Sequence, residues 1–380
     1  MPRFPQVDPQ IAAMRGGVFS RLAHRIAALQ GGGYPLHVGD TWMEPVHGAR
    51  MEDLRDLPGV HRYSAPHGHP ALLRALAERH GVDIERVLVT AGATGALSSI
   101  ASSTLSPGDE VLILSPYWPL IPGVVRAARA CPVEVPLLGG TASLRARLEA
   151  RISGATAALY VNSPHNPTGR VFTEAECAEL AAVARENGLW IWSDEVYAPF
   201  AYARPHRSLA EHAPERTFTV GSASKAYGMA GNRCGWVVGP AEGGVMAELR
   251  KVATHSFYAA PTASQVAAAR ALESGADWVR QARAAYEAAG RAAAVALGQP
   301  APEGGTFLFI DVADVLDERG LDGLLSDCVE EGLVLAPGPS CGADYPTYVR
   351  LCFTSAPPEV VAAGVTVLRG ILERKRGRVS

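Results

Sequence analysis

The sequence lacks the patterns of disulfide-stapled, zinc-binding and membrane-spanning proteins. Its six cysteines are scattered over 380 residues, with no C-x-x-C pair and no cysteine–histidine spacing that would build a zinc site. No stretch reaches the ~18 apolar residues of a membrane span. The amino-terminal MPRFPQVDPQ also lacks the charged-then-apolar profile of a signal peptide. We therefore expect a cytoplasmic protein that has no metal site and does not contact membranes.

The chain also lacks an excess of charge of one sign. Lysine and arginine total 35, against 38 for aspartate and glutamate, which gives a formal net charge of -3. Nucleic acids and anionic membranes are recognised mainly by basic surfaces. The charge balance therefore favours a small-molecule ligand over either of these partners.

Apolar runs and helical stretches, in contrast, alternate along most of the chain. Between about Gly68 and Gly239, short runs such as VLVTAG, EVLILSP, AALYVN, LWIWSDE and TFTVGS alternate with helical sequence. The runs are apolar throughout, as expected of strands covered by helices on both faces. This pattern predicts an α/β fold with a mostly parallel, doubly wound sheet.

The pattern changes after Gly239 and predicts a second, smaller domain. An alanine-rich helical sequence runs from about Ala263 to Leu297, interrupted at Gly275, and a compact α+β region follows. We expect a large domain over residues 45–285 and a small domain formed by residues 1–44 and 286–380. A length of 380 residues is enough for two such domains.

Polar side chains follow several of the predicted strands. Asn166 comes after AALYVN, Asp194 ends LWIWSD, and Lys225 and Arg233 come after TFTV. In an open parallel sheet the carboxyl ends of the strands meet at one edge, and ligands bind there. We therefore expect an amide, a carboxylate, a lysine and an arginine to share one site.

In their order along the chain, several motifs resemble those of the class I/II aminotransferases, enzymes of fold type I that use pyridoxal phosphate (PLP). They are Gly39, Tyr63 with Gly68, AGATGAL, SPYWP, NPTG, SDEVY, SASKAYGMAGNRCGW, APG and YVR. Any one motif would be weak evidence, but the ordered set spans nearly the whole chain. The resemblance implies a large PLP-binding domain and a smaller carboxy-terminal α+β domain.

The resemblance also implies roles for individual residues at the cofactor. Lys225 would carry PLP as a Schiff base and move protons, and Asp194 would pair with the pyridinium nitrogen so that the ring withdraws electrons. Asn166 and Tyr197 would hydrogen-bond the phenolic oxygen, and Trp118 would stack on the ring. The phosphate would be held by the residues of a helix amino terminus, two hydroxyls and a guanidinium: Gly92, Ala93, Thr94, Ser222, Ser224 and Arg233.

Two further roles concern the substrate and the partner subunit. Arg350 would grip the substrate α-carboxylate through a bidentate pair, next to Gly39, Asn166 and Trp118. Tyr63 occupies the place of a tyrosine that reaches the phosphate of the neighbouring subunit. The resemblance thus implies a homodimer with its active site at the interface.

Each residue has an ordinary structural alternative. Lys225 could be a solvated surface lysine, Asp194 a helix cap, Trp118 a core aromatic and Arg350 one half of a structural salt bridge. NPTG could be a simple proline turn, and GATGAL a simple strand-to-helix turn. Their joint occurrence at family-like intervals favours the catalytic interpretation.

The predicted activity is reversible transfer of an amino group between an L-amino acid and a 2-oxo acid. Tyr34, Trp42 and Trp118 favour an aromatic or other neutral substrate. The sequence departs from the family at Gly39-Asp40-Thr41 and at PSCG after the late PG, which are positions that border the substrate side chain.

Two other functions stay open at the level of sequence. A PLP-dependent lyase or cyclase acting on an amino acid would need the same residues, because these reactions begin with the same carbanion. A non-catalytic PLP sensor module is the least favoured, because no helix-turn-helix signature precedes the matching region.

Overall fold

The structure, a computed structural model, describes residues 4–14, 16, 23–29, 32–242 and 244–379. At its centre lies a seven-stranded sheet in which only β8 runs antiparallel to its neighbours. In spatial order the strands are β2 (Val87–Thr90), β8 (Gly235–Val238), β7 (Thr217–Ser222), β6 (Trp190–Asp194), β5 (Thr156–Asn162), β3 (Glu110–Ser115) and β4 (Cys131–Pro136). The predicted α/β fold with a mostly parallel sheet is confirmed.

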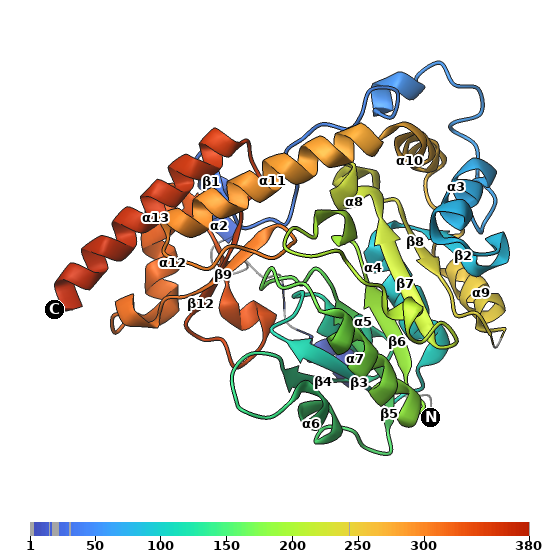
Figure 1. Ribbon diagram of the computed structural model, residues 1–380, viewed down its shortest axis with the longest axis horizontal. Helices are drawn as coiled ribbons and strands as arrows, with labels where there is room; N and C mark the ends of the chain where they lie inside the picture. Colours follow the sequence, from blue (N-terminus) through green and yellow to red (C-terminus); the bar gives the residue numbers. More distant parts are fainter. Residues whose placement is uncertain (1–3, 15, 17–22, 30–31, 243, 380) are drawn as a thin grey trace.

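Helices cover both faces of this sheet, which explains why its strands are apolar throughout (Figure 1). On β3, Val111 and Ile113 belong to the core on one face, whereas Leu112 and Leu114 belong to the core on the other. The first face is covered by α4 (Gly92–Thr104), α5 (Ile121–Ala127) and α9 (Val245–Phe257), and the second by α6 (Leu144–Glu149) and α7 (Glu174–Glu186). Two more helices, α3 (Pro70–His80) and α10 (Thr262–Ser274), pack together beside β2.

The remaining strands form two small sheets next to the carboxy-terminal helices. One is the antiparallel sheet of β11 (Ala336–Pro337), β12 (Tyr348–Cys352) and β9 (Phe307–Asp311), and the other pairs β1 (Tyr34–Pro35) with β10 (Leu333–Val334). They are accompanied by α2 (Ala23–Ala28), α12 (Gly320–Glu330) and α13 (Pro358–Val379). The first helix, α1 (Pro9–Ala12), packs instead on α5.

Short 3-10 helices occupy several connections. They are η1 (Met51–Leu54), η2 (Ile84–Arg86), η3 (Ala198–Phe200), η4 (Leu209–Glu211), η5 (Ala230–Asn232), η6 (Ala313–Val315) and η7 (Gly338–Cys341).

A long helix, α11 (Ala276–Ala296), connects the two parts of the molecule. Figure 1 shows it running from the end of α10 to lie beside α13. Gly275 separates α10 from α11, at the interruption expected from the sequence. The boundary that we propose between the large and small domains, at residues 285 and 286, falls within this helix. Among the described residues, none of the helices combines the length and the apolar character needed to cross a membrane.

The helix that follows the NPTG segment starts with a capping box. The Thr173 side chain accepts from the backbone N–H of Glu176, and the Glu176 carboxylate accepts from the backbone N–H of Thr173 at 2.9 Å. These two bonds satisfy N–H groups that the first turn of α7 would otherwise leave without partners. The cap thus fixes where the loop ends and the helix begins.

We expect Thr173→Ala to lower the free energy of unfolding by about 1 kcal/mol, because it removes the cap. Urea unfolding followed by circular dichroism would measure the change. Thr366→Ala, which removes a threonine hydroxyl from an exposed position inside α13, is the matched control. It should leave stability unchanged or slightly higher, and an equal loss in both variants would contradict a special role for the cap.

Candidate active site

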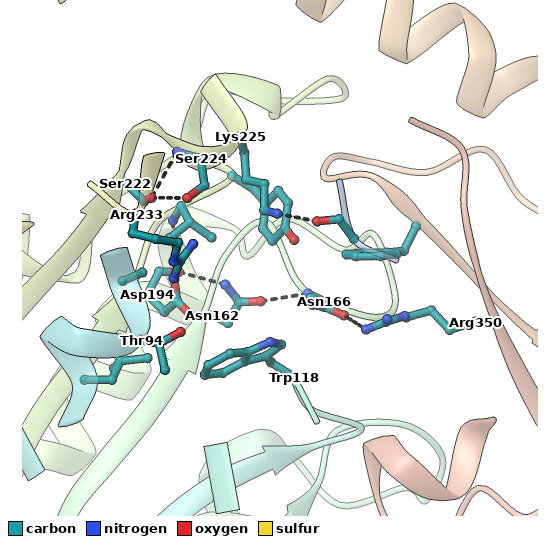
Figure 2. Close-up of a pocket in the computed structure, with 16 residues that line it drawn as sticks. Thr94, Trp118, Asn162, Asn166, Asp194, Ser222, Ser224, Lys225, Arg233 and Arg350 are labelled. Atoms are coloured by element: carbon teal, nitrogen blue, oxygen red, sulfur yellow. Dashed lines mark hydrogen bonds between the residues drawn. The ribbon is translucent and has the colours of Figure 1, made fainter. Parts of the chain in front are cut away.

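A pocket opens at the carboxyl ends of the central strands and extends to the small sheet of β9 and β12 (Figure 2). Its empty space is about 690 Å³, including the open solvent at its mouth. Its lining comes from segments far apart in sequence: Gly39, Ala93, Thr94, Leu97, Trp118, Asn162, Asn166, Asp194, Val196, Tyr197, Ser222, Ser224, Lys225, Arg233, Phe307 and Arg350. The parallel sheet brings many of these residues together because its strands end at one edge, and the small sheet adds Phe307 and Arg350.

Lys225 enters the pocket from a short helix, α8 (Ala223–Ala226), directly after β7. Ser222 caps this helix by accepting from the backbone N–H of Ser224 at 3.0 Å. The Nζ of Lys225 donates to the backbone oxygen of Gly39. Burial lowers the pKa of Lys225, and the nearby Asp40 carboxylate opposes this shift. The lysine is therefore closer to a neutral amine than a surface lysine is.

Asp194 is a buried carboxylate at the end of β6, 5% exposed. Its Oδ2 accepts from the Tyr160 hydroxyl at 2.8 Å, and its Oδ1 accepts weakly from the backbone N–H of Val196 at 3.4 Å. Burial raises the pKa of Asp194 to about 6, although the Tyr160 hydrogen bond acts in the opposite direction. Within the described part of the chain it forms no salt bridge, so a cation entering the pocket would stabilise its charged form.

Asn166 and Arg350 meet on the other side of the pocket. Arg350, on β12, donates to the Asn166 side-chain oxygen and to the backbone oxygen of His37, each at 3.0 Å. The guanidinium lies 4.4 Å from the centre of the Phe307 ring and is 6% exposed. Asn166 is itself held by Asn162, whose side-chain oxygen accepts from its backbone N–H at 2.7 Å. A buried arginine with no carboxylate partner among the described residues is suited to bind the carboxylate of a ligand.

The start of α4 forms an anion cradle together with Ser222, Ser224 and Arg233. The residue before this 13-residue helix, Ala91, provides no side-chain cap, so the first N–H groups of the helix are available to a ligand. The Ser222 hydroxyl donates to that of Ser224 at 2.7 Å. Arg233 covers Gly92, where a Cβ atom would lie only 2.5 Å from the guanidinium. These groups suit a phosphate.

Two aromatic side chains complete the pocket. Trp118 follows β3 and lies across the pocket from Lys225 (Figure 2). Tyr197 is buried and packs edge-on against Phe307, with their ring centres 5.9 Å apart. Burial raises the pKa of Tyr197 well above its usual value, so its hydroxyl keeps its proton and can donate a hydrogen bond.

Sequence similarity identifies the family of the protein that contains this site. A profile of the family "Aminotransferase class I and II" matches residues 32–368. The chain belongs to this family. As a class I/II aminotransferase it depends on PLP and moves an amino group between an amino acid and a 2-oxo acid.

Relatives with known names support this assignment. This aminotransferase is 35% identical over 316 residues to the aspartate/prephenate aminotransferase of Thermus thermophilus, covering 78% of this chain and 80% of the relative. It is 33% identical over 341 residues to the arginine–pyruvate transaminase of Pseudomonas aeruginosa, covering 83% of this chain and 84% of the relative. A solved single mutant of Thermus thermophilus aspartate aminotransferase superposes with a TM-score of 0.87 and 30% identity, covering 97% of this chain and 100% of the other.

The residues of the pocket fit PLP in three independent respects. The uncapped start of α4 with its hydroxyls and Arg233 offers donors for a phosphate. Asp194 is buried without a cationic partner among the described residues, and a protonated ring nitrogen would provide one. Lys225 supplies a half-buried amine with a lowered pKa for the aldehyde carbon.

The structure brings together most of the residues that the sequence singled out, and leaves two outside the lining. Gly92 lies just behind the cradle, under Arg233. Tyr63 is on the surface, 87% exposed, with its ring 5.0 Å from that of Tyr258. The individual roles assigned to these residues remain predictions.

Four residues that line the pocket were not predicted from the sequence: Leu97, Asn162, Val196 and Phe307. Asn162 could have been found, because it is a polar residue at the carboxyl end of an apolar strand, as Asp194 is. Phe307 gave no such signal. It reaches the pocket only because β9 pairs with β12 in the folded chain.

We expect Asp194→Asn to act in opposite directions on the apo and PLP-bound protein. The folded-state pKa of about 6 lies above the ordinary value of 3.8, so burial penalises the charged carboxylate. This penalty grows as the pH rises from 3.8 to about 6 and is complete above 6. At pH 8 the substitution should therefore stabilise the apo protein, by up to about 3 kcal/mol. At pH 5, between the two pKa values, the gain should be about half as large.

In the presence of PLP the same substitution should weaken cofactor binding and abolish most activity, because the ring nitrogen loses its anionic partner. Thermal unfolding of the apo protein at pH 5 and 8, together with a PLP titration, would measure both effects. An apo protein that Asp194→Asn destabilises equally at both pH values would contradict the argument.

Proposed function

We propose that the protein transfers the amino group of a neutral or aromatic L-amino acid to a 2-oxo acid, with Lys225 as its cofactor-bearing base. The observation that carries this proposal is the meeting of Lys225, Asp194 and Arg350 in one pocket. These three supply an amine, an anion for the cofactor ring and a cation for the substrate carboxylate. Amino transfer needs all three.

When bound, PLP accepts the amino group from one substrate, delivers it to the next, and withdraws electrons from the substrate Cα. Lys225 would hold the cofactor between turnovers and, once released, remove the proton from Cα with its neutral Nζ. Its lowered pKa supports this use as a base. Asn166 and Tyr197 would donate hydrogen bonds to the ring oxygen, and Trp118 would cover the ring.

Arg350 is suited to hold the α-carboxylate of the substrate. Its bonds to Asn166 and to the His37 backbone, and its contact with Phe307, fix the plane of the guanidinium before the substrate arrives. Such preorganisation reduces the entropy that binding must overcome. The amino acid would then be oriented with its Cα toward Lys225.

The neighbourhood of the substrate side chain supports a neutral or aromatic substrate. Among the described residues that line the pocket, the only cations are Lys225, Arg233 and Arg350, and each already has a proposed role. Leu97, Trp118, Val196 and Phe307 supply apolar surface. Asp40 interacts electrostatically with Lys225, so it adds negative charge near the pocket, which disfavours a substrate with a second carboxylate.

We expect aromatic and neutral amino acids to have a kcat/KM at least about tenfold above that of aspartate, a difference of about 1.4 kcal/mol. Arg350→Lys should lower kcat/KM for every amino acid in parallel, because the bidentate contact is common to all of them. Turnover of a panel of amino acids with 2-oxo acids would measure both.

The same panel distinguishes transamination from the other reactions that PLP supports. An aspartate preference would overturn the proposed substrate class. Product formation that needs no 2-oxo acid would indicate a lyase or cyclase acting on the same amino acids.

We also propose that the active enzyme is a cytoplasmic homodimer in which Tyr63 completes the site of the partner subunit. An exposed tyrosine next to a second exposed aromatic, Tyr258, suits an interface better than solvent. The six cysteines are free, which agrees with a reducing compartment.

Mixing inactive variants tests the shared site. After unfolding and refolding together, Lys225→Ala and Tyr63→Ala should form hybrid dimers in which one site has both wild-type residues, so activity should exceed that of either variant alone. Lys225→Ala mixed with Arg350→Ala is the control, because both residues belong to the site of one chain. Recovery in the control, or its absence in the first mixture, would contradict a site completed by Tyr63.

A further inference from the structure

Asp194 is held from behind by a tyrosine that does not line the pocket. Tyr160, on β5, donates its hydroxyl proton to Asp194 Oδ2 at 2.8 Å and is 2% exposed. The register of the sheet explains the contact. Asn162 pairs with Asp194, and Tyr160, which pairs with Trp192, lies two residues before Asn162 on the same face of β5. The hydroxyl therefore reaches the carboxylate from beneath the pocket.

This bond leaves the two carboxylate oxygens in different situations. Oδ2 is engaged by Tyr160, whereas Oδ1 accepts only the long bond from the Val196 N–H at 3.4 Å. The backbone oxygen of Asp194 is held as well, by the Asn162 side chain at 2.9 Å. A carboxylate fixed at one oxygen and along its backbone presents the other oxygen in a defined direction.

We propose that Tyr160 is a positioning residue that orients the Asp194 carboxylate toward the cofactor ring nitrogen and stabilises its charged form. This inference rests on the proposed role of Asp194 and extends it to a residue outside the pocket. A hydrogen bond to a charged acceptor in a buried site is stronger than one between neutral groups. Its loss weakens the pairing of Asp194 with the ring.

The other titratable groups around Asp194 do not replace this contact. Glu195 follows it in the chain and bonds instead to Ser193 and Ser208, at 2.8 and 2.6 Å, and to His206. Lys225 and Tyr197 act on Asp194 electrostatically from the pocket side. Tyr160 is thus the side chain that donates to the carboxylate within the described part of the chain.

The test compares Tyr160→Phe in the PLP-bound enzyme with Tyr202→Phe as a matched control. Tyr202 is also buried, 8% exposed, and its hydroxyl donates to the Gly305 backbone oxygen at 2.7 Å. Both variants lose one buried hydrogen bond and should lower thermal stability by similar amounts. Only the Tyr160 variant should change the properties of the bound cofactor.

For Tyr160→Phe we expect PLP to dissociate about tenfold more readily, which corresponds to the loss of a charge-assisted hydrogen bond. The value of kcat should fall by a similar factor with KM nearly unchanged, since the substrate contacts of Arg350 are intact. The pH midpoint of the cofactor's visible absorption band should rise, because a ring nitrogen that holds its proton less firmly contributes less positive charge to the conjugated system.

A Tyr160→Phe enzyme with the PLP affinity, kcat and absorption midpoint of Tyr202→Phe would overturn the proposal. If that variant does not fold, 3-fluorotyrosine at position 160 keeps the shape and makes the hydroxyl a stronger donor. The absorption midpoint should then fall, and an unchanged midpoint would equally overturn the proposal.

Asp194→Asn separates this inference from the proposed function on which it rests. If that variant retains wild-type PLP affinity and spectrum, the role of Asp194 fails and the role of Tyr160 fails with it. If Asp194→Asn is impaired while Tyr160→Phe matches the control, only the inference about Tyr160 is wrong. In the double variant, Tyr160→Phe should add little to the effect of Asp194→Asn, because the two act through one contact.

Discussion

The site depends on the cost of burying one carboxylate. Asp194 lies at the end of a central strand, out of reach of solvent, and the hydrogen bonds it receives do not fully offset the loss of hydration that raises its pKa. An isolated buried charge destabilises a fold, whereas a charge paired with a bound cation stabilises the complex. The protein thus keeps a buried charge without a cationic partner in the described part of the chain, and a protonated PLP ring would complete the pair. Part of the cost of burying the carboxylate would then be recovered as affinity for the cofactor.

A second constraint joins the two parts of the chain at Lys225. Three buried side chains at alternate positions of β12 and just beyond it donate to backbone oxygens of one segment. Arg350 donates to the oxygen of His37, and Cys352 and Thr354 donate to that of Asp40. The segment they fix accepts from Lys225 through the Gly39 carbonyl. Gly39 must lack a side chain, because a Cβ would lie 2.7 Å from the Phe307 ring. The small sheet therefore controls the position of the lysine even though it contributes no acid or base of its own.

Burial has opposite effects on the pKa values of Lys225 and Asp194. Lys225 has its pKa lowered by desolvation and can act as a base, whereas Asp194 has its pKa raised by the same cause and needs a partner to stay charged. Tyr160 engages one oxygen of that carboxylate, which leaves the other for the ring nitrogen that we propose as its partner. One physical effect, removal of water, thus lowers the pKa of the lysine and raises that of the carboxylate.

The sequence by itself determined the α/β class, the alternation of strands and helices, and the residues at the strand ends, because these follow from local periodicity and from the rule that parallel strands end at one edge. Lys225, Asp194, Asn166 and Arg233 were accessible in this way. Only the tertiary structure decided that Phe307 packs beneath Arg350 and that Tyr160 donates to Asp194. These contacts depend on strand pairing and register between segments far apart in the chain, and an apolar run such as AALYVN gives no sign of which neighbour its tyrosine will meet.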